Sequence, residues 1–213
     1  MYTHRGDRAP EYAGLHPAPM FRPAYRGPQV RCITPSELTF RNHMRLLWEQ
    51  HVTWTRLFIN SLAFTLPDTD VVTARLLRNP ADMGAALQPF YGSKIADAYT
   101  NLIHEHLVIA ADLVKAAKKG DTVAAAEAEN KWYANADQII NFLTRINPYL
   151  SKPAFKKLFY SHLQMTKAEA VTILNGEYKE SVDLFDRIER EALMIADALS
   201  EAIIRQFPRM FIR

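Results

Sequence analysis

The chain has 213 residues, room for one compact domain or two small ones at the usual ~100 to 200 residues per domain. Apolar residues make up 48% of it and charged residues 23%, which are the proportions of a globular protein and exclude wholesale disorder. The formal net charge of +3 is confined to residues 1–31, and the rest of the chain carries equal numbers of basic and acidic residues. A basic nucleic-acid-binding face is therefore not expected.

Residues 1–33 are predicted to form a flexible basic arm. The segment is rich in Pro, Arg and Tyr and shows no helical periodicity. Such a composition buries too little apolar surface to offset the entropy of ordering. The aromatic residues alternate with arginines, so the sequence leaves open whether the arm binds a partner surface or stays unpartnered.

The first predicted helix covers residues 36–66. A capping box precedes it, with the Thr34 hydroxyl at the N-cap, Pro35 at the first helical position and Glu37 three residues after the cap. Apolar residues then recur every three or four positions, the spacing of an amphipathic helix.

Two shorter helical segments are predicted next, over residues 69–78 and 81–87. They are separated because Asn79-Pro80 has the form of a helix start signal. Residues 88–92 contain a proline and a glycine and are predicted to form a turn.

Four long helices are predicted in the rest of the chain. Their ranges are about 93–119, 121–147, 151–175 and 178–207. Gly120 and Gly176 are expected to end the first and third of these helices, and Pro148 follows the second. Thr166 begins a Thr-Lys-Ala-Glu string that could cap a new helix, so a break at that position stays open. No segment has the alternation of a strand.

An internal repeat relates the helices. His51, His106 and His162 stand in the similar strings LWEQHV, LIHEHL and LFYSHL, and the last two histidines lie equally far before Gly120 and Gly176. The repeat predicts an all-α, up-down bundle of about six helices in three antiparallel hairpins over residues 34–213. The hairpins cover residues of about 36–92, 93–150 and 151–208.

The same three histidines are the candidate functional residues. They fall on the apolar faces of their helices, where a buried imidazole needs hydrogen-bond partners. One interpretation places them, with carboxylates of neighbouring helices, around a transition metal such as iron, manganese or zinc, as in ferritin-like or hemerythrin-like bundles. The candidate metal ligands are His51, His106, His162, Glu49, Glu105, Glu189 and Glu191. The other interpretation makes them core polar residues and surface acids, and the lack of a Glu-x-x-His pair favours it.

Other functional classes have weaker signals. Trp48, Trp54, Trp132, Tyr133 and residues 89–92 could line a ligand pocket, or could serve as core and end caps. The single cysteine and the few glycines disfavour disulfide frameworks and phosphate-binding loops. No serine stands in a nucleophile elbow, so the sequence shows no catalytic machinery. It also lacks a secretory signal and any apolar stretch of ~20 residues, which predicts a cytoplasmic protein without a membrane span.

Short strings of the chain resemble those of known helical proteins. At WEQHVTWTR, RLLRNP, PFYG, KWYANAD, INPY, EREALMIAD and RQFP, residues 36–211 are similar to a poorly characterised group from spore-forming Gram-positive bacteria. Members of that group often carry the label acetylglutamate kinase. We reject this label because amino-acid kinases need an α/β sheet with glycine-rich phosphate loops.

A second resemblance is to duplicated helical-bundle metalloproteins of the same bacteria, some described as spore-coat proteins. Glu105-His106 and Arg190-Glu191-Ala192 are similar to their helix motifs, but Arg187 stands where those motifs have a histidine. Together, the residues and the resemblances predict a non-catalytic structural or protein-interaction bundle, with a protein partner or self-association and a spore-associated location as further expectations. The alternative is a metal-binding bundle.

Overall fold

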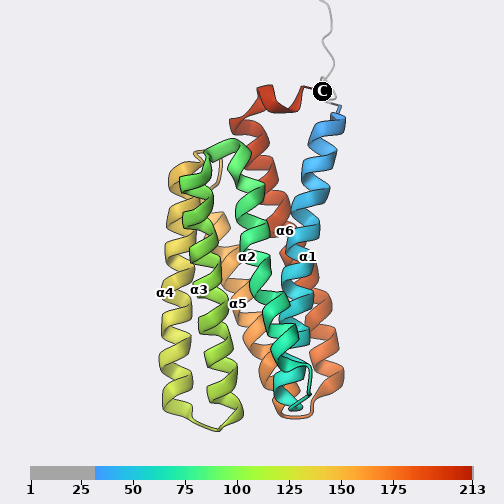
Figure 1. The fold of residues 1–213 in the computed structure, drawn as a ribbon, viewed down its shortest axis with the longest axis vertical. Coiled ribbons are helices and arrows are strands. Elements are labelled where there is room, and N and C mark those ends of the chain that lie inside the picture. Colours follow the sequence, from blue (N-terminus) through green and yellow to red (C-terminus); the bar gives the residue numbers. More distant parts are fainter. Residues whose placement is uncertain (1–31, 213) are drawn as a thin grey trace, which may run out of the picture. The chain divides into compact units, whose positions relative to one another are not determined.

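The computed structural model describes residues 32–212, and those from Ile33 onward form one compact unit (Figure 1). Its helices are α1 (Pro35–Ala63), α2 (Thr69–Tyr91), α3 (Ser93–Lys118), α4 (Thr122–Ile146), α5 (Lys152–Leu174), α6 (Tyr178–Gln206) and the short 3-10 helix η1 (Pro208–Phe211). The described residues contain no strand, so the predicted all-α class is confirmed. The predicted arm over residues 1–33 lies outside the described residues, apart from Cys32 and Ile33.

Successive helices run antiparallel and pack against one another along the chain (Figure 1). Helix α6 returns to pack along α1, which closes the up-down bundle, and α5 also touches α1 and α3. One large apolar cluster draws on all six helices, and a smaller one joins α1, α2, α3 and α5. The three predicted hairpins therefore share a common core.

The predicted N-cap of the first helix is confirmed. The Thr34 hydroxyl accepts a hydrogen bond from the Glu37 amide at 3.2 Å, and it lies 2.8 Å from the Phe211 carbonyl oxygen, to which it donates. The start of α1 is thus tied to the end of the described chain. Helix α1 ends at Ala63, three residues before the predicted end.

Helix α2 is continuous, so the predicted break at Asn79-Pro80 and the predicted turn over residues 88–92 were wrong. Pro80 removes the hydrogen bond that the Leu76 carbonyl would accept and crowds that carbonyl with its ring, yet the helix continues through it. Asn79 and Pro80 are both buried, and the Asn79 side chain bonds to α1. Because these contacts require helical backbone, tertiary packing overrides the local start signal.

Helix α5 is also continuous, which settles the question left open at Thr166. The Thr166 hydroxyl donates to the His162 carbonyl oxygen at 2.9 Å, one turn earlier in the same helix. A hydroxyl engaged with the preceding turn cannot cap a new helix.

The predicted glycine stops are confirmed at both positions. Gly120 and Gly176 have φ of 71° and 78°, in the left-handed region that favours glycine. In each turn the next residue's amide reaches back into the helix, from Asp121 to Ala116 and from Glu177 to Thr172. This pair of matching turns gives structural support to the sequence repeat.

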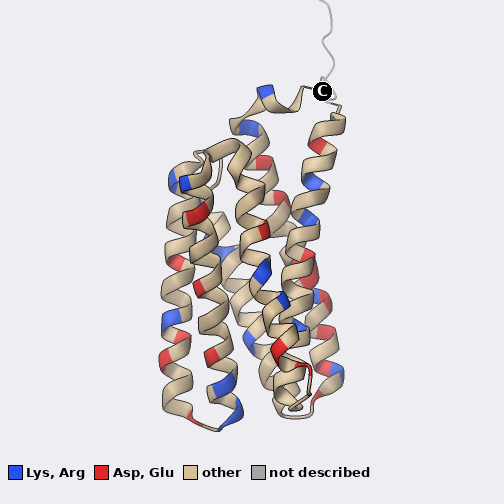
Figure 2. Cartoon of the chain, in the orientation of Figure 1, with Lys and Arg blue, Asp and Glu red and all other residues tan. Residues whose placement is uncertain are grey.

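The surface of the bundle carries both signs of charge. Figure 2 shows Lys and Arg interspersed with Asp and Glu along the helices, as the balanced charge beyond residue 31 predicts. None of the described helices combines the length and the apolar character needed to cross a membrane.

Candidate functional site

The structure brings the three predicted histidines together inside the bundle. His51 of α1, His106 of α3 and His162 of α5 are 5, 3 and 3% exposed. All three line one small cavity of about 20 Å³, and the ring centres of His51 and His162 are 6.1 Å apart. The repeat therefore places its three histidines at one site in the core.

Aromatic rings hold these imidazoles in place. Trp48 contacts His51 and His162, with ring centres 5.4 and 6.3 Å apart. The Trp132 ring centre lies 5.3 Å from that of His106. Because the rings pack closely around the imidazoles, the side chains have little freedom to reorient.

An asparagine fixes the protonation of His51. The His51 Nδ1 lies 3.0 Å from the Asn79 Oδ1, and the Asn79 Nδ2 donates to the Leu47 carbonyl oxygen at 3.0 Å. With its amide nitrogen committed to a carbonyl, the asparagine can only accept from the ring through its oxygen. In the neutral ring the hydrogen therefore sits on Nδ1, and Nε2 keeps a free lone pair.

The second hairpin repeats this arrangement. The His106 Nδ1 lies 2.8 Å from the Asn135 Oδ1, and the Asn135 Nδ2 donates to the Leu102 carbonyl oxygen at 3.3 Å. The same amide also donates to Glu105 at 3.3 Å. In both hairpins the carbonyl belongs to the residue four positions before the histidine, so the internal repeat includes the histidine's buried partner.

The third hairpin departs from this pattern. Glu191 lies as far after Gly176 as Asn135 lies after Gly120, so a glutamate occupies the asparagine's position. Among the described residues, neither the His162 Nδ1 nor the Glu191 Oε2 has a hydrogen-bond partner, although both atoms are buried. The third imidazole is therefore not fixed in one tautomer.

Burial keeps the three imidazoles neutral. Removal from water lowers the pKa of His51, and it lowers the pKa of His106 and His162 to about 3. Mutual repulsion between the rings adds to this effect at His106 and His162. At neutral pH the cavity therefore presents uncharged imidazoles.

Glu169 also lines the cavity, and the sequence reasoning missed it. Its carboxylate forms a buried ion pair with Arg56, which donates in addition to the Ser181 carbonyl oxygen at 3.0 Å. Burial raises the pKa of Glu169 to about 7, against the lowering effect of Arg56. Its spacing from His162, about two helical turns, is the signal that could have revealed it.

The predicted carboxylate ligands lie outside the cavity. Glu49 and Glu189 are neighbours at partly exposed positions, and burial followed by the charge of Glu189 raises the pKa of Glu49. Glu105 is exposed, and the pKa of the partly buried Glu191 is raised by desolvation. Within residues 32–212, no three His, Cys, Asp or Glu side chains are close enough to hold a metal ion. The structure thus unites the predicted histidines but not the predicted carboxylates.

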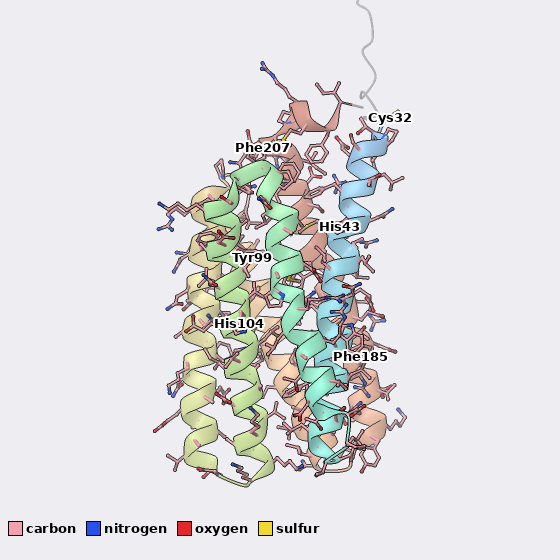
Figure 3. The ribbon with its side chains drawn as sticks, in the orientation of Figure 1. Cys32, His43, Tyr99, His104, Phe185 and Phe207 are labelled. Atoms are coloured by element: carbon pink, nitrogen blue, oxygen red, sulfur yellow. The ribbon has the colours of Figure 1, made fainter. Side chains whose placement is uncertain are left out.

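The remaining histidines of the described chain are surface residues. His43 and His104 are exposed on α1 and α3, as Figure 3 shows. His104 lies two positions before the buried His106, which makes it a natural control for substitutions at the site.

A much larger apolar pocket adjoins the histidine cavity. It has a volume of about 390 Å³, and α1 to α5 all contribute to its wall. Apolar wall residues include Phe58, Ile59, Leu107, Val114 and Leu174. Of the aromatic residues predicted to line a pocket, Trp132 does so, whereas Trp48 lies in the main core and Trp54 packs against the smaller apolar cluster.

The pocket reaches the surface at the turn between α3 and α4. Exposed Gly120, Asp121 and Thr122 form this part of the wall. Nearby, Lys167 of α5 pairs with Glu129 of α4 at 2.6 Å. The pocket is therefore polar at its rim and apolar within.

No family model, curated protein or solved structure matches the chain. The expected resemblance to helical proteins of spore-forming bacteria stays a prediction.

Proposed function

We propose that this protein is a non-catalytic binding protein for a small, largely apolar molecule. The observation that carries the proposal is the apolar pocket of about 390 Å³ inside the bundle. Small-molecule sites in proteins are concave, mostly apolar and about 300 to 1,000 Å³ in volume, with a few polar groups that orient the ligand. The pocket meets each of these conditions.

Close packing elsewhere in the bundle supports this function. Protein interiors leave few voids larger than a water molecule, and empty apolar space costs stability. Ile139, Leu163, Ile195 and Ile204 in the common core are fully buried. A pocket of this size beside such a core is the space that a bound molecule would fill.

Titration with a neutral fluorescent naphthylamine tests the proposal. We expect saturable binding at one site, with an increase in probe emission as the dye leaves water. Ala125→Phe places a large ring at the pocket wall and should abolish binding. Ala134→Phe, at an exposed position of the same helix, is the matched control and should bind normally. Equal binding by both variants, or no binding by the native protein, would contradict the proposed function.

A metal-binding role is the second candidate. It is favoured by the Asn79 and Asn135 contacts, since metal-binding histidines commonly use their other ring nitrogen to donate to a fixed acceptor. Because no three such side chains of the described residues are close enough to hold an ion, the three central histidines would have to move together to bind iron, manganese or zinc through their Nε2 atoms. Elemental analysis of untagged protein, purified without chelators, tests this. Near-stoichiometric metal that is lost in His106→Ala would support it, and only traces of metal would rule it out.

The protein-interaction role expected from the sequence stays a prediction. It assigns partner binding to the arm, which lies outside the described residues, or to an apolar face of the bundle. The cytoplasmic and spore-associated locations likewise stay predictions.

A further inference from the structure

The pocket and the histidine cavity are adjacent and share part of their walls. Both are bounded by Thr55, Leu107, Ala110, Trp132 and Thr166. A molecule that fills the pocket therefore ends against the wall of the cavity. The chemistry of this inner end decides which atoms such a molecule can place there.

The cavity presents two imidazole acceptors, and its wall also includes Trp132 and His162, whose buried Nε1 and Nδ1 atoms have no hydrogen-bond partner among the described residues. In the described part of the chain, the side chains of His51 and His106 form hydrogen bonds only through Nδ1. Since each Nδ1 donates to an asparagine oxygen, each Nε2 holds a lone pair and no hydrogen. An unpaired buried acceptor is costly, so a donor at this place would be stabilised.

Neither Thr166 nor Glu169 supplies that donor. The Thr166 hydroxyl donates within its own helix, to the His162 carbonyl oxygen. The Glu169 carboxylate is held by Arg56. His162 has one ring hydrogen that no other side chain fixes, so this ring is free to donate to a ligand oxygen.

The volume of the cavity limits the size of the polar group that a ligand can place in it. The cavity volume of about 20 Å³ exceeds the ~10 to 15 Å³ needed for one water molecule. A single hydroxyl group needs a similar volume. A ligand that ends in a carboxylate has no hydrogen to donate. Its negative charge would also lose its hydration beside uncharged imidazoles. An ammonium group would also lose its hydration without gaining a carboxylate, because Glu169 is already paired.

From this arrangement we infer that the ligand is an apolar alcohol, whose hydroxyl occupies the histidine cavity and donates to an imidazole Nε2. The inference rests on the proposed binding function and names the class of molecule bound. The hydrocarbon body lies in the large pocket. His51 and His106 supply the acceptors, and His162 can donate to the hydroxyl oxygen.

Competition against the naphthylamine probe tests this assignment. The competitors are decanol, its methyl ether and decanoate, which share one hydrocarbon chain and differ in the polar end. We expect decanol to bind about three- to tenfold more tightly than the ether, as one net hydrogen bond allows. Decanoate should bind more weakly than decanol.

Substitution of the histidines locates the effect. His106→Phe and His51→Phe, tested separately, should still bind the probe but should lower or remove the preference for decanol over the ether. His104→Phe, at an exposed position of the same helix as His106, should keep the full preference. Circular dichroism and thermal unfolding identify any variant that fails to fold, and the comparison of ligands on native protein stands without the variants.

The outcomes separate this inference from the function on which it rests. If the probe binds but native protein does not prefer decanol to the ether, the alcohol assignment fails and the binding function stands. If the preference survives in both histidine variants, or near-stoichiometric metal occupies the native cavity, the assignment also fails. If neither the probe nor any competitor binds, the proposed function itself fails.

Discussion

The histidine–asparagine contacts are the most specific feature at the scale of single residues. Each asparagine joins an imidazole to a backbone carbonyl on the neighbouring helix, so one side chain satisfies two buried groups. Removing it leaves the imidazole Nδ1–H without a partner, whereas the carbonyl keeps the helical bond that it accepts from the amide four residues later. The cost of the loss should therefore exceed that of one ordinary hydrogen bond.

We predict that Asn135→Leu lowers the free energy of unfolding by about 1 to 3 kcal/mol, the penalty for an unpaired buried polar group. The group left unpaired is the His106 Nδ1–H, since the Leu102 carbonyl keeps its helical hydrogen bond. Urea denaturation measures the change. Asn130→Leu, at an exposed position of the same helix, should have little effect. Equal stability of the two variants would argue against the described contacts.

The buried histidines also predict how stability changes with pH. The pKa of His106 and His162 is about 3 in the folded protein, below the usual 6.5, so the unfolded chain binds more protons between these values. The contribution of the two histidines to the free energy of unfolding is complete above pH 6.5 and is lost as the pH falls toward 3. Glu169 has the opposite effect on stability. Folding raises its pKa from 4.5 to about 7, so the folded protein binds more protons between these values and the contribution of Glu169 grows as the pH falls.

We therefore expect the free energy of unfolding to fall by roughly 2 kcal/mol between pH 7 and pH 5, since two histidines outweigh one glutamate. Urea titrations at the two pH values measure this difference. In His106→Phe the loss should shrink, whereas His104→Phe should keep the native dependence. A native protein that is equally stable or more stable at pH 5 would contradict the prediction.

The histidines of the site were predictable from the sequence, but their partners were not. His51, His106 and His162 fall on apolar helix faces, and burial follows from that position. Asn79 was hidden because Asn-Pro has the form of a helix start. Glu169 was hidden because its string has the form of a capping box at Thr166. In both places a local signal competes with tertiary contacts, and only the three-dimensional structure shows which prevails.

At the scale of elements, α2 and α3 approach one another closely at Gly84. A Cβ atom at this position would lie 1.9 Å from the Thr100 Oγ1 and 2.9 Å from the Ala96 carbonyl oxygen. The three hairpins and most helix ends were predictable from caps, glycines and prolines, whereas the continuity of α2 was not. This close approach was not, since glycine in a helix has no periodic signal of its own.

We predict that Gly84→Ala destabilises the protein by about 1 to 3 kcal/mol through overpacking, although alanine is the better helix former by ~1 kcal/mol. Thermal or urea unfolding measures the change. Thr100→Ala removes the closest clashing atom, so it should recover part of the loss in the Gly84→Ala background. A Gly84→Ala variant as stable as the native protein would show that the two helices can separate at little cost.

At the scale of the whole bundle, the pocket lies where α1 to α5 converge, beside a tightly packed common core. Composition and periodicity predicted the closed bundle because they record which faces are apolar. They could not predict the pocket, whose volume depends on how side chains of five helices fit together. The candidate function therefore comes from packing more than from any sequence motif.

Ligand binding should stabilise the folded bundle. We predict that decanol at about 100 times its dissociation constant raises the free energy of unfolding by about 2.7 kcal/mol, as mass action requires for one site on the folded state. Urea denaturation with and without the alcohol measures the gain. Ala125→Phe should show no gain, and Ala134→Phe should show the native one. A gain of equal size in both variants would place the alcohol elsewhere on the protein.

The two histidine–asparagine contacts also provide two natural reporters of local opening inside the molecule. The Nδ1 hydrogens of His51 and His106 are each held by an amide oxygen in the dry interior. Such hydrogens exchange slowly with solvent and become visible in proton magnetic resonance, where those of exposed rings are lost. Because the two reporters belong to different hairpins, their separate exchange rates would show whether the hairpins open together or one at a time.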